Sequence, residues 1–167
     1  MTTAESFEKL NSIAVSLKEQ LESVGMKCAF AESCTGGMVA AAMAGVPGVS
    51  AVLCGSMVTY RDDSKSSWIG VDPALIAQHS AESGEVTSAM VVGLLEKTPE
   101  ADVGAAVTGH LGPDAPADKD GKVFVAVARR GDGSALVKEL KLVSSDRIER
   151  QIEAAVLVLE TLFEFIR

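Results

Sequence analysis

Residues 28–44 constrain the fold of this chain more than any other stretch. Residues 28–31 form a short apolar run with the composition of a buried strand. Residues 38–44, made of alanine, valine and methionine, have the composition of a packed helix. The polar, glycine-containing segment 32–37 joins them and reads Glu-Ser-Cys-Thr-Gly-Gly. A strand followed at once by a helix is the building unit of an α/β fold.

The hydrophobic periodicity elsewhere in the chain agrees with this fold class. Further strands are expected at 51–60, 101–108, 122–128 and 135–143, and helices at 7–21, from 61, from 72, at 85–97 and from 146 to the end. Gly131-Asp132-Gly133 lies between the last two strands and predicts a hairpin. Because a hairpin is antiparallel, the sheet of this α/β sandwich must be mixed. At 167 residues the chain is predicted to be a single domain, 1–167.

The charge and the aromatic content of the chain limit the kinds of molecule that it is expected to bind. Lysine and arginine number 15 against 23 acidic residues, so the net charge is −8, and no basic run occurs. Nucleic acid and anionic membranes are therefore not expected as partners. One tryptophan and one tyrosine make an aromatic platform for single-stranded nucleic acid implausible. A small anionic substrate remains compatible with the sequence, because a pocket needs only a few local donors.

We expect a cytoplasmic protein without a metal site. Residues 1–10 are polar and acidic, unlike a signal peptide, and the longest apolar stretch, 51–58, is too short to span a bilayer. The three cysteines are odd in number and lack a C-x-x-C spacing, which fits a reducing compartment. Together with two histidines they do not form a plausible zinc-ligand pattern.

Three predicted strands end in polar residues, namely Ser33, Tyr60 and Thr108, and should present them on one side of the sheet. Ligands of open α/β sheets bind outside the carboxyl ends of strands. A hydroxyl at a strand-to-helix turn can be a nucleophile, with free helix amides holding an oxyanion. Serine and threonine are also preferred helix N-caps, so a capping role for Ser33 or Thr35 is the other interpretation.

Lys65 follows Tyr60 by five residues and suggests a base for Ser33. A serine–lysine pair works when the amine is neutral, and burial of a lysine lowers its pKa. We therefore predict Lys65 within hydrogen-bond reach of Ser33, partly buried, with a lowered pKa. The competing interpretation is a solvated Lys65 and a Tyr60 that belongs to the core.

Several motifs together resemble a known family. They are the segment 31–37 (Ala-Glu-Ser-Cys-Thr-Gly-Gly), Gly55-Ser56 through Thr59-Tyr60 with Lys65, and Thr108-Gly109 with Gly112-Pro113. These residues resemble the C-terminal domain of the competence/damage-inducible protein CinA, a family that includes stand-alone nicotinamide-nucleotide amidases. The resemblance runs from about the first helix to the last. It implies a three-layer α/β/α sandwich with a mixed sheet of about five strands, and a homo-oligomer.

The resemblance also implies an activity, the hydrolysis of nicotinamide mononucleotide to nicotinate mononucleotide and ammonia without metal or other cofactor. Ser33 would be the nucleophile, activated by Lys65 with Tyr60. The residues implied for substrate binding are Glu32, Thr35, Gly36, Gly37, Thr108, Gly109, Gly112 and Arg147. The Gly36 and Gly37 amides and Thr108 would line the nucleotide pocket. The partner is thus a small nucleotide substrate.

The loop after Thr108 departs from the family pattern. Asp114 and Ala115 stand where the family has glycines, and His110 stands where it has isoleucine. Asp114 adds a carboxylate near a site meant for phosphate, and predicts weaker binding of the nucleotide or preference for a less anionic amide. His110 is either an acid/base or phosphate contact, or an ordinary loop residue.

Smaller departures occur at Arg61-Asp62, where the family has Ser-Asn, and at 145–147, which match the start of its last helix only in part.

Two functional hypotheses of different class follow. One is an amidohydrolase acting on nicotinamide mononucleotide or a related pyridine nucleotide. The other is a paralogue, non-catalytic or of altered specificity, that binds a nucleotide or a protein partner. A redox role for a Cys34 thiolate at the helix start is a third.

Overall fold

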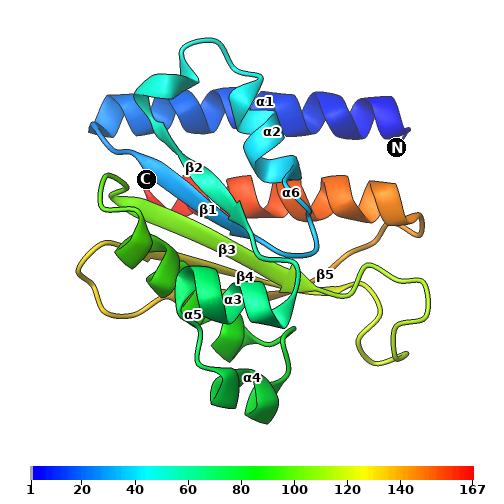
Figure 1. The fold of residues 1–167 in the computed structure, drawn as a ribbon. Coiled ribbons are helices and arrows are strands. Elements are labelled where there is room, and N and C mark those ends of the chain that lie inside the picture. The colour runs from blue at the N-terminus through cyan, green and yellow to red at the C-terminus, as the bar shows by residue number, and fades with distance from the viewer. Residues whose placement is uncertain (1) are drawn as a thin grey trace.

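Residues 2–167 are described by a computed structural model, and they build a mixed five-stranded sheet with the order β2-β1-β3-β4-β5 (Figure 1). The strands are β1 (Cys28–Glu32), β2 (Leu53–Val58), β3 (Val103–Gly109), β4 (Lys122–Arg129) and β5 (Leu136–Lys141). β1 pairs in parallel with both β2 and β3, whereas β4 runs antiparallel to β3 and β5. The predicted mixed sheet is confirmed, and the antiparallel part comes from the predicted hairpin.

Helices cover both faces of the sheet, which confirms the α/β/α layering (Figure 1). One face carries α1 (Thr3–Val24), α2 (Met38–Ala44) and α6 (Arg147–Phe165), with the short 3-10 turn η1 (Val49–Ala51) nearby. The other face carries α3 (Asp62–Ile69), α4 (Pro73–His79) and α5 (Gly84–Lys97). In Figure 1 the long helices α1 and α6 lie side by side on their face.

Helix ends follow from local sequence chemistry. Thr2 and Glu5 form a reciprocal capping box at the start of α1, and Gly25 ends that helix with a φ of 67°. Asp146 caps α6 by accepting hydrogen bonds from the amides of the next turn. Each device satisfies backbone groups that a helix end leaves without partners.

Alternation along the strands separates two cores. Phe30 of β1 and Val107 of β3 face the layer of α1 and α6, whereas Ala31 and Ala106 face α5.

Small residues on the face that α3 and α5 cover let these helices approach closely. A side chain at Gly93 of α5 would collide with the backbone carbonyl of Ile69 at the end of α3. This contact fixes α3 against α5, and α3 is the helix that carries Lys65.

The parallel arrangement of β1, β2 and β3 brings their carboxyl ends to one edge of the sheet. Ser33, Tyr60 and the loop that begins at His110 follow these three ends. Within residues 2–167, no helix combines the length and the apolar character that crossing a membrane requires.

Candidate active site

Ser33 is the first residue after β1 and lies on the side of the sheet that α3 and α5 cover. Its amide donates to the carbonyl of Val107 in β3 at 3.2 Å, which continues the sheet pairing by one residue. Because side chains alternate along a strand, Glu32 points to the opposite layer. Ser33 is buried, with 8% of the residue exposed.

Lys65 reaches Ser33 from the middle of α3. The Lys65 Nζ lies 3.3 Å from the Ser33 Oγ and donates to the Thr59 carbonyl at 2.9 Å, with the Tyr60 carbonyl at 3.5 Å. The side chain is 1% exposed, which places an amine in the interior of the protein. The predicted proximity to Ser33 is confirmed, and the burial is more complete than predicted.

Burial lowers the pKa of Lys65 below its ordinary value, because the charged ammonium loses its hydration. The charges of Asp62 and Glu82 act in the opposite direction. Desolvation is the largest of these influences. A lowered pKa increases the fraction of neutral amine, the form that can take a proton from a hydroxyl.

Tyr60 and Arg147 form the rim of the site. The phenol of Tyr60 is 56% exposed and accepts a hydrogen bond from Arg147 Nη2 at 3.2 Å. Arg147 Nη1 donates to the carbonyl of Gly112. The guanidinium therefore connects the residue after β2 with the loop after β3. The contact that Tyr60 makes with Lys65 runs through its backbone carbonyl and not through the phenol.

These residues surround a cavity of about 300 Å³. Its charged and polar walls come from the carboxyl ends of all three parallel strands, from the loop after β3 and from the start of α6. The lining residues are Ser33, Cys34, Tyr60, Glu82, Gly109, His110, Leu111, Gly112, Pro113, Asp114, Ala115, Pro116 and Arg147.

The loop after β3 is tied down by Arg150 of α6. The Arg150 guanidinium donates to both carboxylate oxygens of Asp120, at 2.6 and 2.8 Å, and to the carbonyl of Leu111 at 3.3 Å. This planar two-point contact keeps the loop folded over the cavity. Asp114 within it has a φ of 68°, a left-handed conformation that favours glycine.

The chain matches the CinA C-terminal domain over residues 10–166. It belongs to the CinA C-terminal domain family. A CinA-like protein of Geobacter sp. (strain M21) is 40% identical over 131 residues, which are 77% of this chain and 30% of that protein. A CinA-like protein of Mycobacterium leprae (strain TN) is 39% identical over 120 residues, 71% of this chain and 28% of that protein. The chain thus spans less than a third of the length of these curated relatives.

Solved structures share the fold over nearly the whole chain. The competence/damage inducible protein CihA of Agrobacterium tumefaciens has a TM-score of 0.89 and 30% identity, and the match covers 95% of this chain and 96% of that chain. The competence damage-inducible protein A of Klebsiella pneumoniae has a TM-score of 0.87 and 29% identity, covering 93% and 95%. Family membership therefore rests on sequence and on structure.

Glu32, the first residue of the CinA motif 32–37, does not face the cavity. Its carboxylate is fully buried and accepts five hydrogen bonds of 2.8 to 3.0 Å. The donors are the hydroxyls of Thr35 and Ser56 and the amides of Gly37, Val39 and Ala40. Glu32 thus closes the N-terminus of α2 from inside. The expectation that free α2 amides hold an oxyanion is wrong for these three amides, because the carboxylate already occupies them.

Four further residues implied for substrate binding also lie elsewhere. Thr35 is buried and bonded to Glu32, and the Gly36 amide donates to the Ser33 carbonyl at 3.0 Å. Gly36 and Gly37 line a different cavity, between α1 and α2. Thr108 is buried with its hydroxyl 2.7 Å from that of Thr87 in α5. The side chain of Thr108 points into the α5 layer, since it alternates with Val107. The structure does bring Gly109, Gly112 and Arg147 to the Ser33 cavity.

Cys34 lies beside Ser33 but keeps its proton. Burial raises the pKa of its thiol to about 12. A thiolate stabilised at the helix start, which the redox interpretation needs, is therefore absent at neutral pH. Cys34 packs with the core on the α1 and α6 side.

The sequence analysis missed the role of Thr59 and did not single out Glu82. The backbone carbonyl of Thr59 accepts a hydrogen bond from Lys65, and a pattern of side chains in the sequence cannot predict a backbone acceptor. Glu82 lines the cavity from the segment between α4 and α5. It lies in a polar stretch without periodicity, and only the packing of α5 against the sheet brings it to Ser33.

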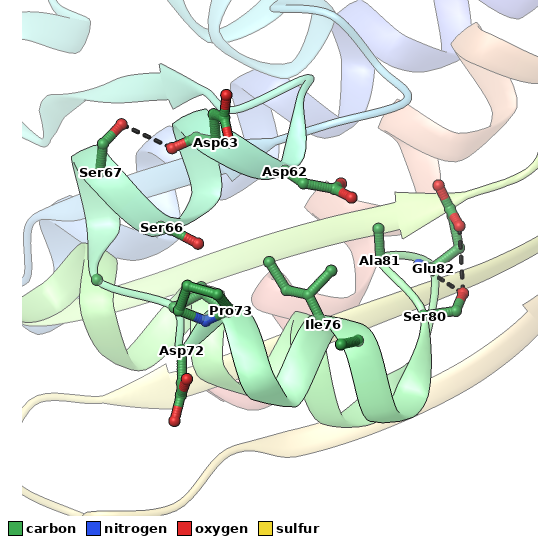
Figure 2. A pocket seen from close by; sticks show the side chains of 13 residues that line it. Asp62, Asp63, Ser66, Ser67, Asp72, Pro73, Ile76, Ser80, Ala81 and Glu82 are labelled. Carbon is green, nitrogen blue, oxygen red and sulfur yellow. Dashed lines mark hydrogen bonds between the residues drawn. The ribbon is translucent and has the colours of Figure 1, made fainter.

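A larger cleft of about 1250 Å³ separates α3 from α4 (Figure 2). Figure 2 shows Asp62 and Asp63 on its α3 side and Ile76 on its α4 side, with Glu82 at one end. Ser33 does not line this cleft. Glu82 lines both spaces, so this residue lies at the boundary between them.

Proposed function

We propose that this protein is an amidohydrolase that converts nicotinamide mononucleotide, or a closely related pyridine-nucleotide amide, to the acid and ammonia. The observation that carries the proposal is the buried Lys65 amine 3.3 Å from the Ser33 hydroxyl at the wall of a cavity. Membership of the CinA family supports the choice of reaction. An amide carbonyl that enters the cavity meets a hydroxyl with a base already beside it.

The proposed reaction begins with proton transfer from the Ser33 hydroxyl to neutral Lys65. A neutral amine has two N–H donors and one lone pair. The carbonyls of Thr59 and Tyr60 can take the two donors, which leaves the lone pair for the serine proton. The Ser33 Oγ then bonds to the carboxamide carbon and forms a tetrahedral oxyanion.

Collapse of this intermediate breaks the C–N bond. The Lys65 ammonium returns its proton to the leaving nitrogen, so ammonia departs and an ester on Ser33 remains. A water molecule that loses a proton to Lys65 attacks the ester, and the proton returns to the Ser33 oxygen as the acid leaves. The amide of Cys34, which follows Ser33, lines the cavity and does not donate to Glu32, is the proposed oxyanion donor.

The charged residues of the cavity influence which substrate charge it can accept. Arg147 brings one permanent positive charge, whereas Glu82 and Asp114 bring two carboxylates. Two like charges about 4 Å apart at an effective dielectric of about 20 repel by roughly 4 kcal/mol. A 5′-phosphate is therefore held less well than a neutral substituent unless it lies at Arg147. This favours a less anionic amide as the better substrate.

Release of ammonia from nicotinamide mononucleotide and its riboside, measured beside a panel of unrelated primary amides, tests the proposal. The expected result is turnover of a pyridine amide that is lost in Ser33→Ala. Nucleotide binding without ammonia release would favour the non-catalytic paralogue instead. Turnover that persists in Ser33→Ala would refute the nucleophile assignment.

The protein is further proposed to be a single-domain homo-oligomer. An apolar content of 47% and exposed side chains such as Trp68 and Val143 leave apolar surface for self-association. Sedimentation at micromolar concentration should show a species larger than the 17.3 kDa chain. A monomer alone would contradict this proposal.

A further inference from the structure

Two residues of the Ser33 cavity, His110 and Glu82, have no part in the reaction proposed above. His110 follows β3 and Glu82 precedes α5, so the two reach the cavity from different elements of the fold. The His110 amide donates to the Lys122 carbonyl, and the His110 carbonyl accepts from the Gly121 amide, both at 2.9 Å. These bonds fix the His110 backbone in the wall of the cavity.

The His110 ring offers an unused polar atom. Its Nε2 is buried and has no hydrogen-bond partner within residues 2–167. Glu82 Oε2 lies 3.6 Å away, which is beyond hydrogen-bond length. A buried polar atom without a partner costs free energy, and a ligand in the cavity that supplies the partner recovers it.

The Glu82 carboxylate is fixed in direction by the turn that precedes it. Ser80 has a φ of 75°, a strained value for a residue other than glycine. Its hydroxyl accepts from the Glu82 amide and donates to Glu82 Oε2, both at 3.3 Å, as Figure 2 shows for this turn. The backbone and the carboxylate of Glu82 are thus each held by the Ser80 hydroxyl, and a side chain that is already held loses less entropy when a ligand binds it.

We propose that His110 and Glu82 form a specificity-determining pair that recognises the vicinal hydroxyl groups of a sugar-bearing amide. This inference rests on the proposed function, because it concerns the part of the substrate beyond the scissile amide. A hydroxyl both donates and accepts, so a diol can donate to the carboxylate and pair with the ring nitrogen in either tautomer. A phosphate fits this point less well than the diol, since it is mostly dianionic at neutral pH and would face the charge of Glu82.

Binding to a Ser33→Ala protein separates recognition from turnover. The two probes are nicotinamide riboside, which carries the diol, and 1-methylnicotinamide, which has the same charged ring and carboxamide without hydroxyls. Isothermal titration calorimetry gives the dissociation constant of each probe. In His110→Ile and in Glu82→Gln, we expect the preference for the riboside over the methyl compound to fall by at least about tenfold.

The chain contains a matched control in a second histidine–glutamate pair. His79 Nδ1 lies 3.5 Å from Glu85 Oε1, and neither residue lines the Ser33 cavity. His79→Ala and Glu85→Gln should leave the preference unchanged within about twofold. An effect of the same size in these controls would overturn the inference.

Other outcomes also decide the question. If the His110 and Glu82 variants lose affinity for both probes equally, or if the riboside does not bind, the pair does not read hydroxyls and the inference fails. If the riboside binds in a manner that depends on His110 while the wild-type protein releases no ammonia, the amidase proposal fails and the inference stands.

Discussion

Glu32 and Ser33 are neighbours in the chain, but they face opposite layers and serve different ends. The Glu32 carboxylate is fully buried, accepts five hydrogen bonds and lines no cavity described here. The Ser33 hydroxyl has the Lys65 amine beside it and opens on a cavity. A fully satisfied buried polar group stabilises structure, whereas an accessible hydroxyl next to a base is prepared for a reaction. The motif 32–37 thus combines a structural and a chemical residue.

The largest expected effect is the loss of activity in Ser33→Ala. Removal of the nucleophile should reduce kcat for ammonia release by at least about a thousandfold. The free energy of unfolding should change by less than about 1 kcal/mol, because Ser33 gives up no helix cap. Ammonia release and urea denaturation measure the two quantities. A large fall in the free energy of unfolding with an unchanged kcat would mean that Ser33 has a structural role, as Glu32 does, and is not the nucleophile.

Glu32→Ala should do the opposite and act first on stability. Three backbone amides and two hydroxyls lose their acceptor, so the free energy of unfolding should fall by about 3–5 kcal/mol. Ser56→Ala is the matched control, since it removes one of the five hydrogen bonds and should cost about 1 kcal/mol. Urea denaturation measures both. A change below about 1 kcal/mol in Glu32→Ala would mean that α2 does not depend on this carboxylate.

Asp114→Gly tests the part of the comparison that concerns the Ser33 cavity. It removes a carboxylate and places glycine at a φ of 68°, so both nucleotide binding and stability should improve. We expect kcat/KM for nicotinamide mononucleotide to rise at least about tenfold and that for the riboside to change less. Ala115→Gly, an uncharged change next to it, is the control. Equal specificity constants before and after the substitution would show that the charge of Asp114 is irrelevant.

The smallest expected effect is a shift of the pH profile in Asp62→Asn. Neutral Lys65 is the proposed base, so activity should rise with pH through the pKa of Lys65. The Asp62 charge raises that pKa, hence its removal should move the acidic limb of kcat/KM to lower pH. Asp63→Asn changes the neighbouring charge and should not shift the limb. Added salt should reduce the shift, since Asp62 is exposed. A shift toward higher pH would exclude Lys65 as the base.

The fold class could be predicted from the amino-acid sequence, because strand and helix periodicities and the hairpin at Gly131-Asp132-Gly133 are local properties. The sequence also pointed to Ser33 and Lys65, since the motif 32–37 and the spacing from Tyr60 are visible in one dimension. The different faces of Glu32 and Ser33, and the orientation of Thr108 away from the cavity, could not be predicted in this way, because the face of each residue depends on strand register in the folded protein. The proximity of Glu82 to His110 could not be predicted either, since it depends on how α5 packs against the sheet. Local chemistry is encoded in order along the chain, whereas the environment of each side chain depends on residues far away in sequence.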